Sequence, residues 1–257
     1  MLKNQYDYII CGGGASGLLM AYRICNDPYF KDRTLLLIEK DSKDSNDRTW
    51  CFWESGEGDL ETMVHKTWNH AYFNADDFEM DFSLQPFRYK MIRSLDFYQS
   101  MNNKLAEFDQ LTRIKASVSS IEDGWVTTEV QSFQGSMVFS SIYNPKSLYQ
   151  QKKYPVLLQH FVGQVVQTQK PCFDPDKIEF MNFNVPQKGN TRFMYVLPLG
   201  PNKALLEYTL FSQNALQRKE YSDAIADFLK NLPTGGYKIL EEEEGKIPMT
   251  CYRFDLK

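Results

Sequence analysis

A glycine motif near the start constrains the fold more than any other feature of this sequence. Residues 12–17 read Gly-Gly-Gly-Ala-Ser-Gly and fit the pattern Gly-x-Gly-x-x-Gly. The motif follows a β-type run at residues 6–11 and precedes an apolar segment at residues 18–24 with helical spacing. In a strand–turn–helix context, these glycines permit a tight turn, close approach of a pyrophosphate and close helix packing, and the helix start attracts phosphates. The predicted phosphate-binding residues are Gly12, Gly13, Gly14, Ala15, Ser16 and Gly17.

A second β-type run, residues 34–38, ends in Glu39, about 20 residues after the glycine motif. An acidic side chain at this place accepts hydrogen bonds from the ribose hydroxyls of an adenosine. The alternative is a glycine-rich turn in another α/β domain, with Glu39 as a solvated strand end. Because the strand, the glycine turn, the helix and the acidic residue occur in the expected order and spacing, we expect a dinucleotide-binding unit. The motif alone does not distinguish NAD from FAD.

Composition excludes several classes of function. The net charge is −4 and the basic residues are not clustered, so we expect no nucleic-acid partner. The five cysteines are scattered and lack a Cys-x-x-Cys pair, which indicates reduced thiols in the cytoplasm. The three histidines have no metal-ligand spacing, so we expect no metal site. No apolar run approaches the roughly 20 residues that span a bilayer, and the immediate start of the first strand leaves no room for a signal peptide.

The rest of the first half has the pattern expected for a dinucleotide-binding domain. Apolar residues recur at helical spacing over 94–108, with Ser94 as a plausible N-cap. Residues 72–87 are irregular and aromatic, which is typical of short strands. Further strands are expected at 114–118, 125–130 and 137–139, the last of them returning to the dinucleotide sheet.

The second half has the pattern of an antiparallel sheet. Strands are predicted at 156–167, 178–183, 192–198 and 204–211, followed by an amphipathic helix at 217–232. The acidic run 241–244 is interpreted as a solvated face, and residues 144–155 as a crossing between domains. The expected fold class is therefore α/β, with a Rossmann-like first domain over 1–145 and an α+β substrate domain over 146–257. Part of residues 60–90 is open to assignment to the substrate region.

Several short segments share their order with one protein family. They read Arg-Thr-Trp-Cys-Phe at 48–52, Leu-Gln-His-Phe-Val-Gly at 158–163, Phe-Asp-Pro at 173–175, Tyr-Val-Leu-Pro at 195–198, Ala-Leu-Leu-Glu-Tyr-Thr at 204–209 and Ile-Pro-Met-Thr at 247–250. With the glycine motif, they make the chain resemble the flavin-dependent lycopene cyclases of bacteria, particularly the type related to the plant β-cyclases. The glycine motif is shared by many proteins, whereas the Arg-Thr-Trp, Leu-Glu-x-Thr and Ile-Pro-Met-Thr segments in this order are specific.

The resemblance implies a flavoprotein of carotenoid biosynthesis. Its members use reduced FAD, with NAD(P)H as the electron source, and isomerise the ends of lycopene or another linear carotene to the β-ionone rings of γ- or β-carotene. The reaction has no net oxidation or reduction. A substrate dissolved in the bilayer implies a peripheral protein at the cytoplasmic face of the membrane. The resemblance also implies flavin contacts from Arg48, Thr49 and Trp50.

Glu207 is the predicted catalytic acid. Protonation of an alkene requires a carboxyl group that a dry environment keeps protonated, and Glu207 shares a strand face with Leu205, Thr209 and Phe211. It matches the first Glu of the family's Phe-Leu-Glu-Glu-Thr signature, and the resemblance implies that this Glu is catalytic. The second Glu is replaced here by Tyr208, so the signature does not supply two adjacent carboxylates. The alternative for Glu207 is a strand glutamate paired with a nearby Lys or Arg.

Aromatic side chains after the second strand are candidates for stabilising a carbocation. Trp50, Phe52 and Trp53 offer ring faces, and ordinary core packing is the alternative for each. One position departs from the family pattern, because Asn182 stands where relatives carry Asp in Met-Asp-Phe. An asparagine can hydrogen-bond but cannot titrate.

The chain stops at Lys257, soon after Ile-Pro-Met-Thr, whereas relatives continue. We therefore expect a truncated chain that lacks the C-terminal return to the FAD domain. Two other functions stay open: a redox flavoprotein of the hydroxylase or isoprenoid-reductase type, and an inactive FAD-binding fragment.

Overall fold

The computed structural model describes residues 3–142 and 146–253. The chain folds into two compact units, each assembled from two separate stretches of sequence. The first unit is formed by Met1–Thr49 with Arg93–Asn144, and the second by Trp50–Ile92 with Pro145–Lys257.

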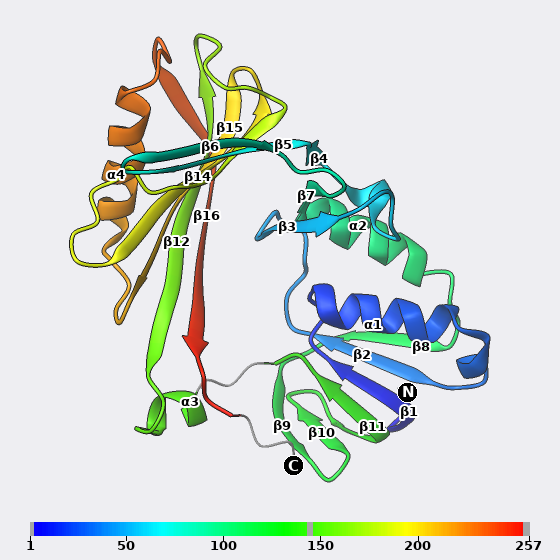
Figure 1. Ribbon diagram of the computed structural model, residues 1–257. Coiled ribbons are helices and arrows are strands. Elements are labelled where there is room, and N and C mark those ends of the chain that lie inside the picture. Colours follow the sequence, from blue (N-terminus) through cyan, green and yellow to red (C-terminus); the bar gives the residue numbers. More distant parts are fainter. Residues whose placement is uncertain (1–2, 143–145, 254–257) are drawn as a thin grey trace. The chain divides into compact units, whose positions relative to one another are not determined.

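The first unit is built on a six-stranded sheet with the order β8-β2-β1-β11-β10-β9 (Figure 1). The four strands β8, β2, β1 and β11 are parallel, and β10 and β9 are added antiparallel. Helix α1 packs on β1 and β2, and α2 packs against α1. The bounds are β1 (Gln5–Cys11), α1 (Ala15–Asn26), η1 (Pro28–Phe30), β2 (Leu35–Glu39), α2 (Ser94–Leu105), β8 (Leu111–Lys115), β9 (Val118–Glu122), β10 (Trp125–Thr128) and β11 (Ser132–Ser140).

This arrangement confirms the expected Rossmann-like class, because β1 lies between two parallel neighbours and is followed by a helix that covers it. β2 is buried along four of its five residues, which is typical of a central parallel strand. The prediction of Ser94 as a helix cap is wrong. Arg93 holds the N-cap position, and the Ser94 hydroxyl instead accepts a hydrogen bond from the Arg48 backbone N–H at 3.0 Å.

The second unit is built on a seven-stranded sheet with the order β16-β12-β15-β14-β13-β5-β6, and a three-stranded sheet has the order β3-β7-β4. All neighbours in the large sheet are antiparallel except β13 and β5. This confirms the mostly antiparallel second sheet. The bounds are β3 (Thr49–Glu54), η2 (Glu61–Met63), β4 (Lys66–Trp68), β5 (His70–Ala75), β6 (Phe78–Ser83), β7 (Arg88–Arg93), α3 (Lys146–Gln150), β12 (Val156–Thr168), β13 (Lys177–Asn182), β14 (Thr191–Gly200), β15 (Lys203–Ser212), α4 (Arg218–Lys230) and β16 (Tyr237–Thr250).

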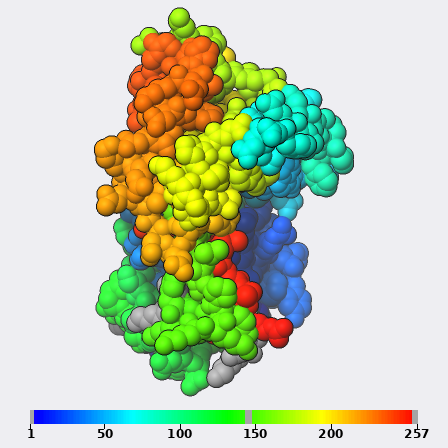
Figure 2. Space-filling model, turned by 60° about the vertical axis from the view of Figure 1, so that its left-hand side comes forward, coloured from blue at the N-terminus to red at the C-terminus, as the bar shows by residue number. Residues whose placement is uncertain are grey.

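The two faces of the large sheet carry different cores. Helix α4 covers one face through Tyr221, Ile225 and Leu229, and its outer surface is the orange band in Figure 2. The opposite face packs against Trp68 and residues of the small sheet. The Trp68 indole is fully buried and donates to the Pro198 carbonyl at 2.9 Å. Each face of the sheet therefore has its own buried apolar cluster.

The units do not follow the single division expected near residue 145. Residues 50–92 belong to the second unit, because β5 pairs in parallel with β13 and β6 extends the same sheet. The roles assigned to the two domains stay predictions. The expected crossing at 144–155 begins at residues outside the described part of the chain, and its described part contains α3.

Lys90 of β7 is fully buried and binds three oxygens. Its ammonium group contacts the Glu54 carboxylate at 2.7 Å, the Gly56 carbonyl at 2.7 Å and the Glu61 carboxylate. Burial lowers the pKa of Lys90, but the two carboxylates more than offset this effect and the pKa is raised. The buried cation therefore holds the loop after β3 against β7.

A second buried polar network lies under α4. The His160 ring contacts the Tyr221 hydroxyl through Nδ1 at 2.6 Å and the Ser212 hydroxyl through Nε2 at 2.8 Å. The Ser212 hydroxyl donates its proton to the Asn214 carbonyl at 2.5 Å, so it accepts from Nε2 of His160, which carries the ring proton. Nδ1 therefore accepts from the Tyr221 hydroxyl. His160 is fully buried, and burial lowers its pKa.

We predict that acid weakens the second unit through His160. A lowered folded-state pKa means that the unfolded chain binds more protons below about pH 6.5, so the free energy of unfolding falls as the pH drops through that value. Urea unfolding at a series of pH values measures this effect. His160→Gln should flatten the dependence below pH 6.5, whereas His70→Gln, at an exposed histidine, should leave it unchanged. Equal slopes in all three proteins would contradict the prediction.

Candidate functional site

The glycine turn of the first unit has the geometry that a phosphate site requires. Gly12 has a φ of +104°, in the left-handed region that side chains rarely adopt. A Cβ on Gly17 would lie 1.9 Å from the Gly12 carbonyl oxygen, so α1 starts in close contact with the end of β1. By contrast, a Cβ on Gly14 would meet nothing within 4 Å. No side chain caps α1 at its start, and no acidic residue lies in its first turn.

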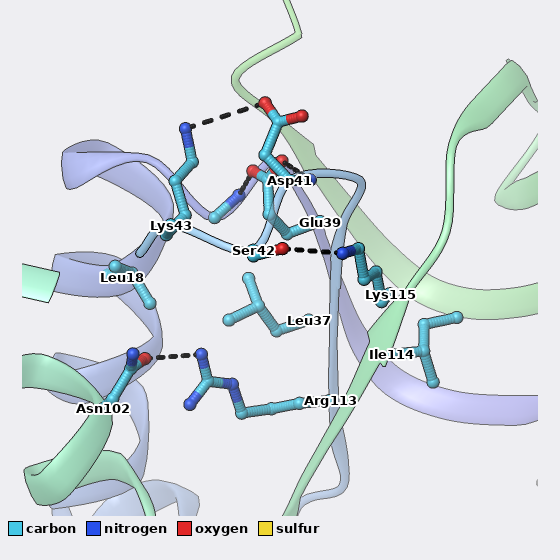
Figure 3. Close-up of a pocket in the computed structure, with 11 residues that line it drawn as sticks. Leu18, Leu37, Glu39, Asp41, Ser42, Lys43, Asn102, Arg113, Ile114 and Lys115 are labelled. Atoms are coloured by element: carbon cyan, nitrogen blue, oxygen red, sulfur yellow. Dashed lines mark hydrogen bonds and ion pairs between the residues drawn. The ribbon is translucent and has the colours of Figure 1, made fainter. Parts of the chain in front are cut away.

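Glu39 lies beside this turn, at the end of β2 (Figure 3). Its carboxylate accepts hydrogen bonds from the Gly13 backbone N–H at 2.5 Å and the Asp41 backbone N–H at 2.8 Å. Each carboxylate oxygen has two acceptor positions, so each retains one for a ligand hydroxyl. The structure thus brings the predicted phosphate-binding glycines and the predicted ribose-binding acid together.

A cavity of about 210 Å³ opens next to Glu39 between the ends of β2 and β8. Its lining is partly charged and includes Lys43, Arg113 and Lys115. Lys115 donates to the Ser42 hydroxyl at 2.7 Å, and Arg113 donates to the Asn102 amide oxygen at 2.6 Å (Figure 3). Polar groups at the end of a parallel sheet, beside a glycine turn, suit the nucleoside half of a dinucleotide.

The other predicted cofactor residues, Arg48, Thr49 and Trp50, lie at the junction of the two sequence segments that form the first and second units. Arg48 is paired with Ser94 at the start of α2, where the Ser94 backbone N–H donates to the Arg48 carbonyl at 2.9 Å. Thr49 is the last residue of its segment of the first unit, and Trp50 belongs to the second unit. The roles of Arg48, Thr49 and Trp50 in cofactor binding stay predictions.

Glu207 lies in the middle of β15, on the face of the large sheet opposite α4. Its neighbours in register are Tyr195 on β14 and Gly163 on β12. Part of the side-chain surface remains accessible, but the carboxyl is largely surrounded by protein. Burial, followed by the charge and hydrogen bond of Glu243, raises the pKa of Glu207 to about 8. This shift favours the protonated form of the carboxyl at neutral pH.

Glu243 is the functional candidate that the sequence interpretation missed. The expectation of a solvated face at 241–244 is wrong for this residue, because β16 pairs with β12 and places Glu243 opposite Gly163. Its neighbours Glu242 and Glu244 lie on the other face and bind Arg218, at 3.0 and 2.5 Å. The alternation of a strand could have separated these residues into two faces, but only if β16 had been recognised as a strand.

A group of aromatic rings extends from the acid, with Tyr195 and Tyr89 close enough to sense its charge. The rings of Trp53 and Tyr89 have centroids 4.7 Å apart, those of Tyr89 and Phe180 5.7 Å apart, and those of Phe180 and Tyr195 5.7 Å apart. Burial raises the pKa of Tyr195 to about 12 and raises the pKa values of Tyr89 and Cys51 as well. These groups are neutral at physiological pH. We call Trp53, Tyr89, Phe180 and Tyr195 the aromatic wall.

Of the three aromatic residues proposed from the sequence, only Trp53 belongs to this wall. Side chains alternate along β3, so Cys51 and Trp53 face one way while Trp50 and Phe52 face the other. The sequence of this segment shows no alternating pattern because aromatic residues occupy both faces.

Asn182 lies on the opposite face of the sheet from Glu207. It pairs in register with Met194, next to Glu179, and its amide donates to the Glu179 carboxylate at 2.9 Å. A bulge with Met181 at a φ of +70° puts residues 179 and 182 on the same face. Within this unit, Asn182 therefore takes no part in the surroundings of Glu207.

Neither a metal centre nor a spanning helix is found among residues 3–142 and 146–253. No group of three or more His, Cys, Asp or Glu side chains there could hold a metal ion. No helix in the same residues is long and apolar enough to cross a membrane.

Comparisons with known proteins agree on one family and one fold. The family model described as "Lycopene cyclase protein" matches residues 7–254. A lycopene beta-cyclase of Pantoea ananas is 23% identical, over 97% of this chain and 64% of its own length. This chain thus spans less than two thirds of that relative.

Several solved structures share the fold. A geranylgeranyl bacteriochlorophyll reductase-like protein from Thermoplasma acidophilum has a TM-score of 0.66 and 14% identity, covering 95% of this chain and 66% of its own. The flavin-dependent brominase Bmp2 has a TM-score of 0.62 and 13% identity, covering 96% and 68%. PqsL, a probable FAD-dependent monooxygenase from Pseudomonas aeruginosa, has a TM-score of 0.62 and 13% identity, covering 93% and 73%. At such low identity, these likenesses show the fold alone.

The glycine turn gives a test of the packing. We predict that Gly17→Ala lowers the free energy of unfolding by about 3 kcal/mol, because the new methyl group would collide with the backbone at Gly12. Gly14→Ala is the matched control and should cost less than about 1 kcal/mol, because its methyl group points into open space. Urea unfolding measures both. A smaller loss for Gly17→Ala than for Gly14→Ala would overturn this account of the turn.

Proposed function

The chain belongs to the lycopene cyclase protein family, and we propose that it isomerises the ends of a linear carotene such as lycopene to β-ionone rings. The observation that carries this proposal is the carboxyl of Glu207, which is protonated at neutral pH and lies among aromatic rings. An acid in that state can protonate a hydrocarbon, which an ionised carboxylate cannot do.

In the proposed reaction, the substrate gains one proton and later loses one proton. Glu207 donates its proton to the terminal alkene, and the resulting carbocation is attacked by a second double bond of the chain, which closes the ring. Loss of a proton from the ring then creates the new double bond, and the carboxylate left at Glu207 accepts that proton. No electron is gained or lost, so the step is an isomerisation.

The aromatic wall supports the charged intermediate of this reaction. A cation over an aromatic face in a site removed from water is stabilised by about 2 kcal/mol or more per contact. Trp53 and Tyr195 lie at the two ends of the wall, and both belong to the same unit as Glu207. Cys51 and Tyr89 are neutral neighbours and do not offer a base that would capture the proton early.

We propose FAD as the bound dinucleotide, held by the first unit. The glycine turn, residues 12–17, offers uncapped helix N–H groups and open space at Gly14 for the pyrophosphate, and Glu39 offers carboxylate oxygens to the ribose. Arg48, Thr49 and Trp50 are proposed as further contacts. Reduced FAD would supply a negative charge that stabilises a carbocation, with NAD(P)H as the reductant. A carotene substrate further implies peripheral association with the membrane at its cytoplasmic face.

The proposal is tested by the pigments of a host that accumulates lycopene. Expression of the chain should convert red lycopene to orange-yellow cyclic carotenes, which chromatography identifies. A redox flavoprotein that reduces the polyene would bleach the pigment instead. Unchanged lycopene, in cells that contain the folded protein, would count against the activity of this chain.

We predict that Glu207→Gln abolishes cyclisation, because the amide cannot donate a proton to an alkene. We expect loss of cyclic carotene by at least about 100-fold, the lower range for general acid catalysis. Flavin content, measured from the absorbance of the purified protein, should be unchanged, since Glu207 belongs to the unit without the glycine turn. A variant that forms product at the original rate would refute the assignment of the acid.

We predict that Gly14→Val loses FAD while it keeps the fold. The valine side chain meets no protein atom near its Cβ, but it fills the space through which a pyrophosphate would approach the backbone. Flavin absorbance and far-UV circular dichroism measure the two properties. If purified Gly14→Val protein stays yellow, the phosphates lie elsewhere.

A further inference from the structure

Two carboxyl side chains that are far apart in sequence meet over one glycine of the second unit. Gly163 of β12 pairs in register with Glu207 of β15 on one side and with Glu243 of β16 on the other. A Cβ on Gly163 would lie 3.1 Å from the Cγ atoms of both glutamates. Any larger residue at 163 would therefore push against both side chains. The absence of a side chain on the middle strand is what lets the two carboxyls make their hydrogen bond.

A hydrogen bond between two carboxyl groups requires that one of them carry a proton. An ionised carboxylate only accepts, so a doubly ionised pair would have two acceptors and no donor, together with repulsion of like charges. A pair with one proton has a donor, an acceptor and a single negative charge. The geometry over Gly163 therefore favours the singly protonated state of the pair.

We propose that Glu243 is a positioning residue that shares one proton with Glu207, so that the second carboxyl beside the acid comes from a neighbouring strand. The role of Glu243 in the reaction rests on the proposed function. The sharing of a proton between Glu207 and Glu243 does not depend on that function. The inference deepens that function by assigning the second carboxyl to a different strand.

The shared proton gives a balanced cycle. Glu207 gives its proton to an alkene carbon, where a C–H bond forms, and an electron pair of the next double bond forms the C–C bond of the ring. A C–H bond of the ring then breaks, its electrons become the new double bond, and its proton returns to the carboxyl pair. During the intermediate both carboxylates are ionised, and their negative charge attracts the carbocation. The pair ends with the single proton with which it began.

The remaining titratable groups around the pair do not compete for this proton. They face Glu207 from three other strands: Cys51 on β3, Tyr89 on β7 and Tyr195 on β14. Burial raises the pKa of each of them, so they are neutral when the pair holds one proton. The ionisable partner of Glu207 in this set is Glu243.

Carbon-13 NMR of the full chain labelled at the glutamate carboxyl carbons tests the inference without substrate or flavin. In the wild type, two glutamate signals should shift together in one step near pH 8, because both carbons sense the same proton. One signal should vanish in Glu207→Gln and the other in Glu243→Gln. In each variant, the remaining signal should titrate about one pH unit or more lower, since the like charge is gone.

Glu244→Gln is the matched control, because it removes the neighbouring carboxylate that points to the other face and binds Arg218. It should leave both signals and the step near pH 8 unchanged. A single signal that titrates near pH 8 in the wild type, or a step near pH 8 that persists in Glu243→Gln, would contradict the shared proton. Burial alone would then explain the raised pKa of Glu207.

The pigment assay separates this inference from the proposed function. If the protein cyclises lycopene, Glu243→Gln should move the alkaline limit of its activity to lower pH, whereas Glu244→Gln should not. A coupled titration without cyclic carotene would contradict the proposed function alone. Cyclisation with independent titrations would contradict the role of Glu243 alone.

Discussion

A carboxyl group removed from water must find a proton or a counter-charge, and the second unit meets that requirement with a proton. The long antiparallel pairing of β15, β12 and β16 brings Glu207 and Glu243 together over Gly163. A cation in place of Glu243 would hold Glu207 ionised, and the residue would then be useless as an acid. The chemistry proposed for the chain thus depends on which side chain the edge strand places next to the acid.

The features that could be predicted from the sequence are those that local physics determines. The glycine turn depends on backbone freedom within a few residues, and the helix at 217–232 follows from apolar periodicity, so both were predicted correctly. Glu207 was selected by strand alternation and by resemblance. Glu243 was not, because a run of four acidic residues has no visible alternation and the pairing of β16 with β12 joins residues about 80 positions apart. For the same reason, the sequence left the assignment of residues 60–90 open and did not indicate that the whole of 50–92 joins the second half.

The large sheet separates structural from chemical polar groups. On the face under α4, His160, Tyr221 and Ser212 satisfy one another, and Asn182 satisfies Glu179. The face opposite carries Glu207 and the aromatic wall. A polar residue within a family motif can therefore serve packing, as Asn182 does here, without reaching the carboxyl that we propose as the acid.

The ion cluster at Lys90 has a consequence for how the aromatic wall can vary. Lys90 and Tyr89 are adjacent on β7 and point to opposite faces, and Glu54 follows Trp53 on β3 in the same way. Two rings of the wall are thus backed by a charge cluster whose cation is fully buried, where added salt screens poorly. Substitutions in the wall would leave this anchor untouched, whereas neutralising Glu61 would remove one partner of the Lys90 cation and loosen the packing behind the rings. The shape of the aromatic wall and its resistance to ionic strength are in this way controlled from different sides of the same small sheet.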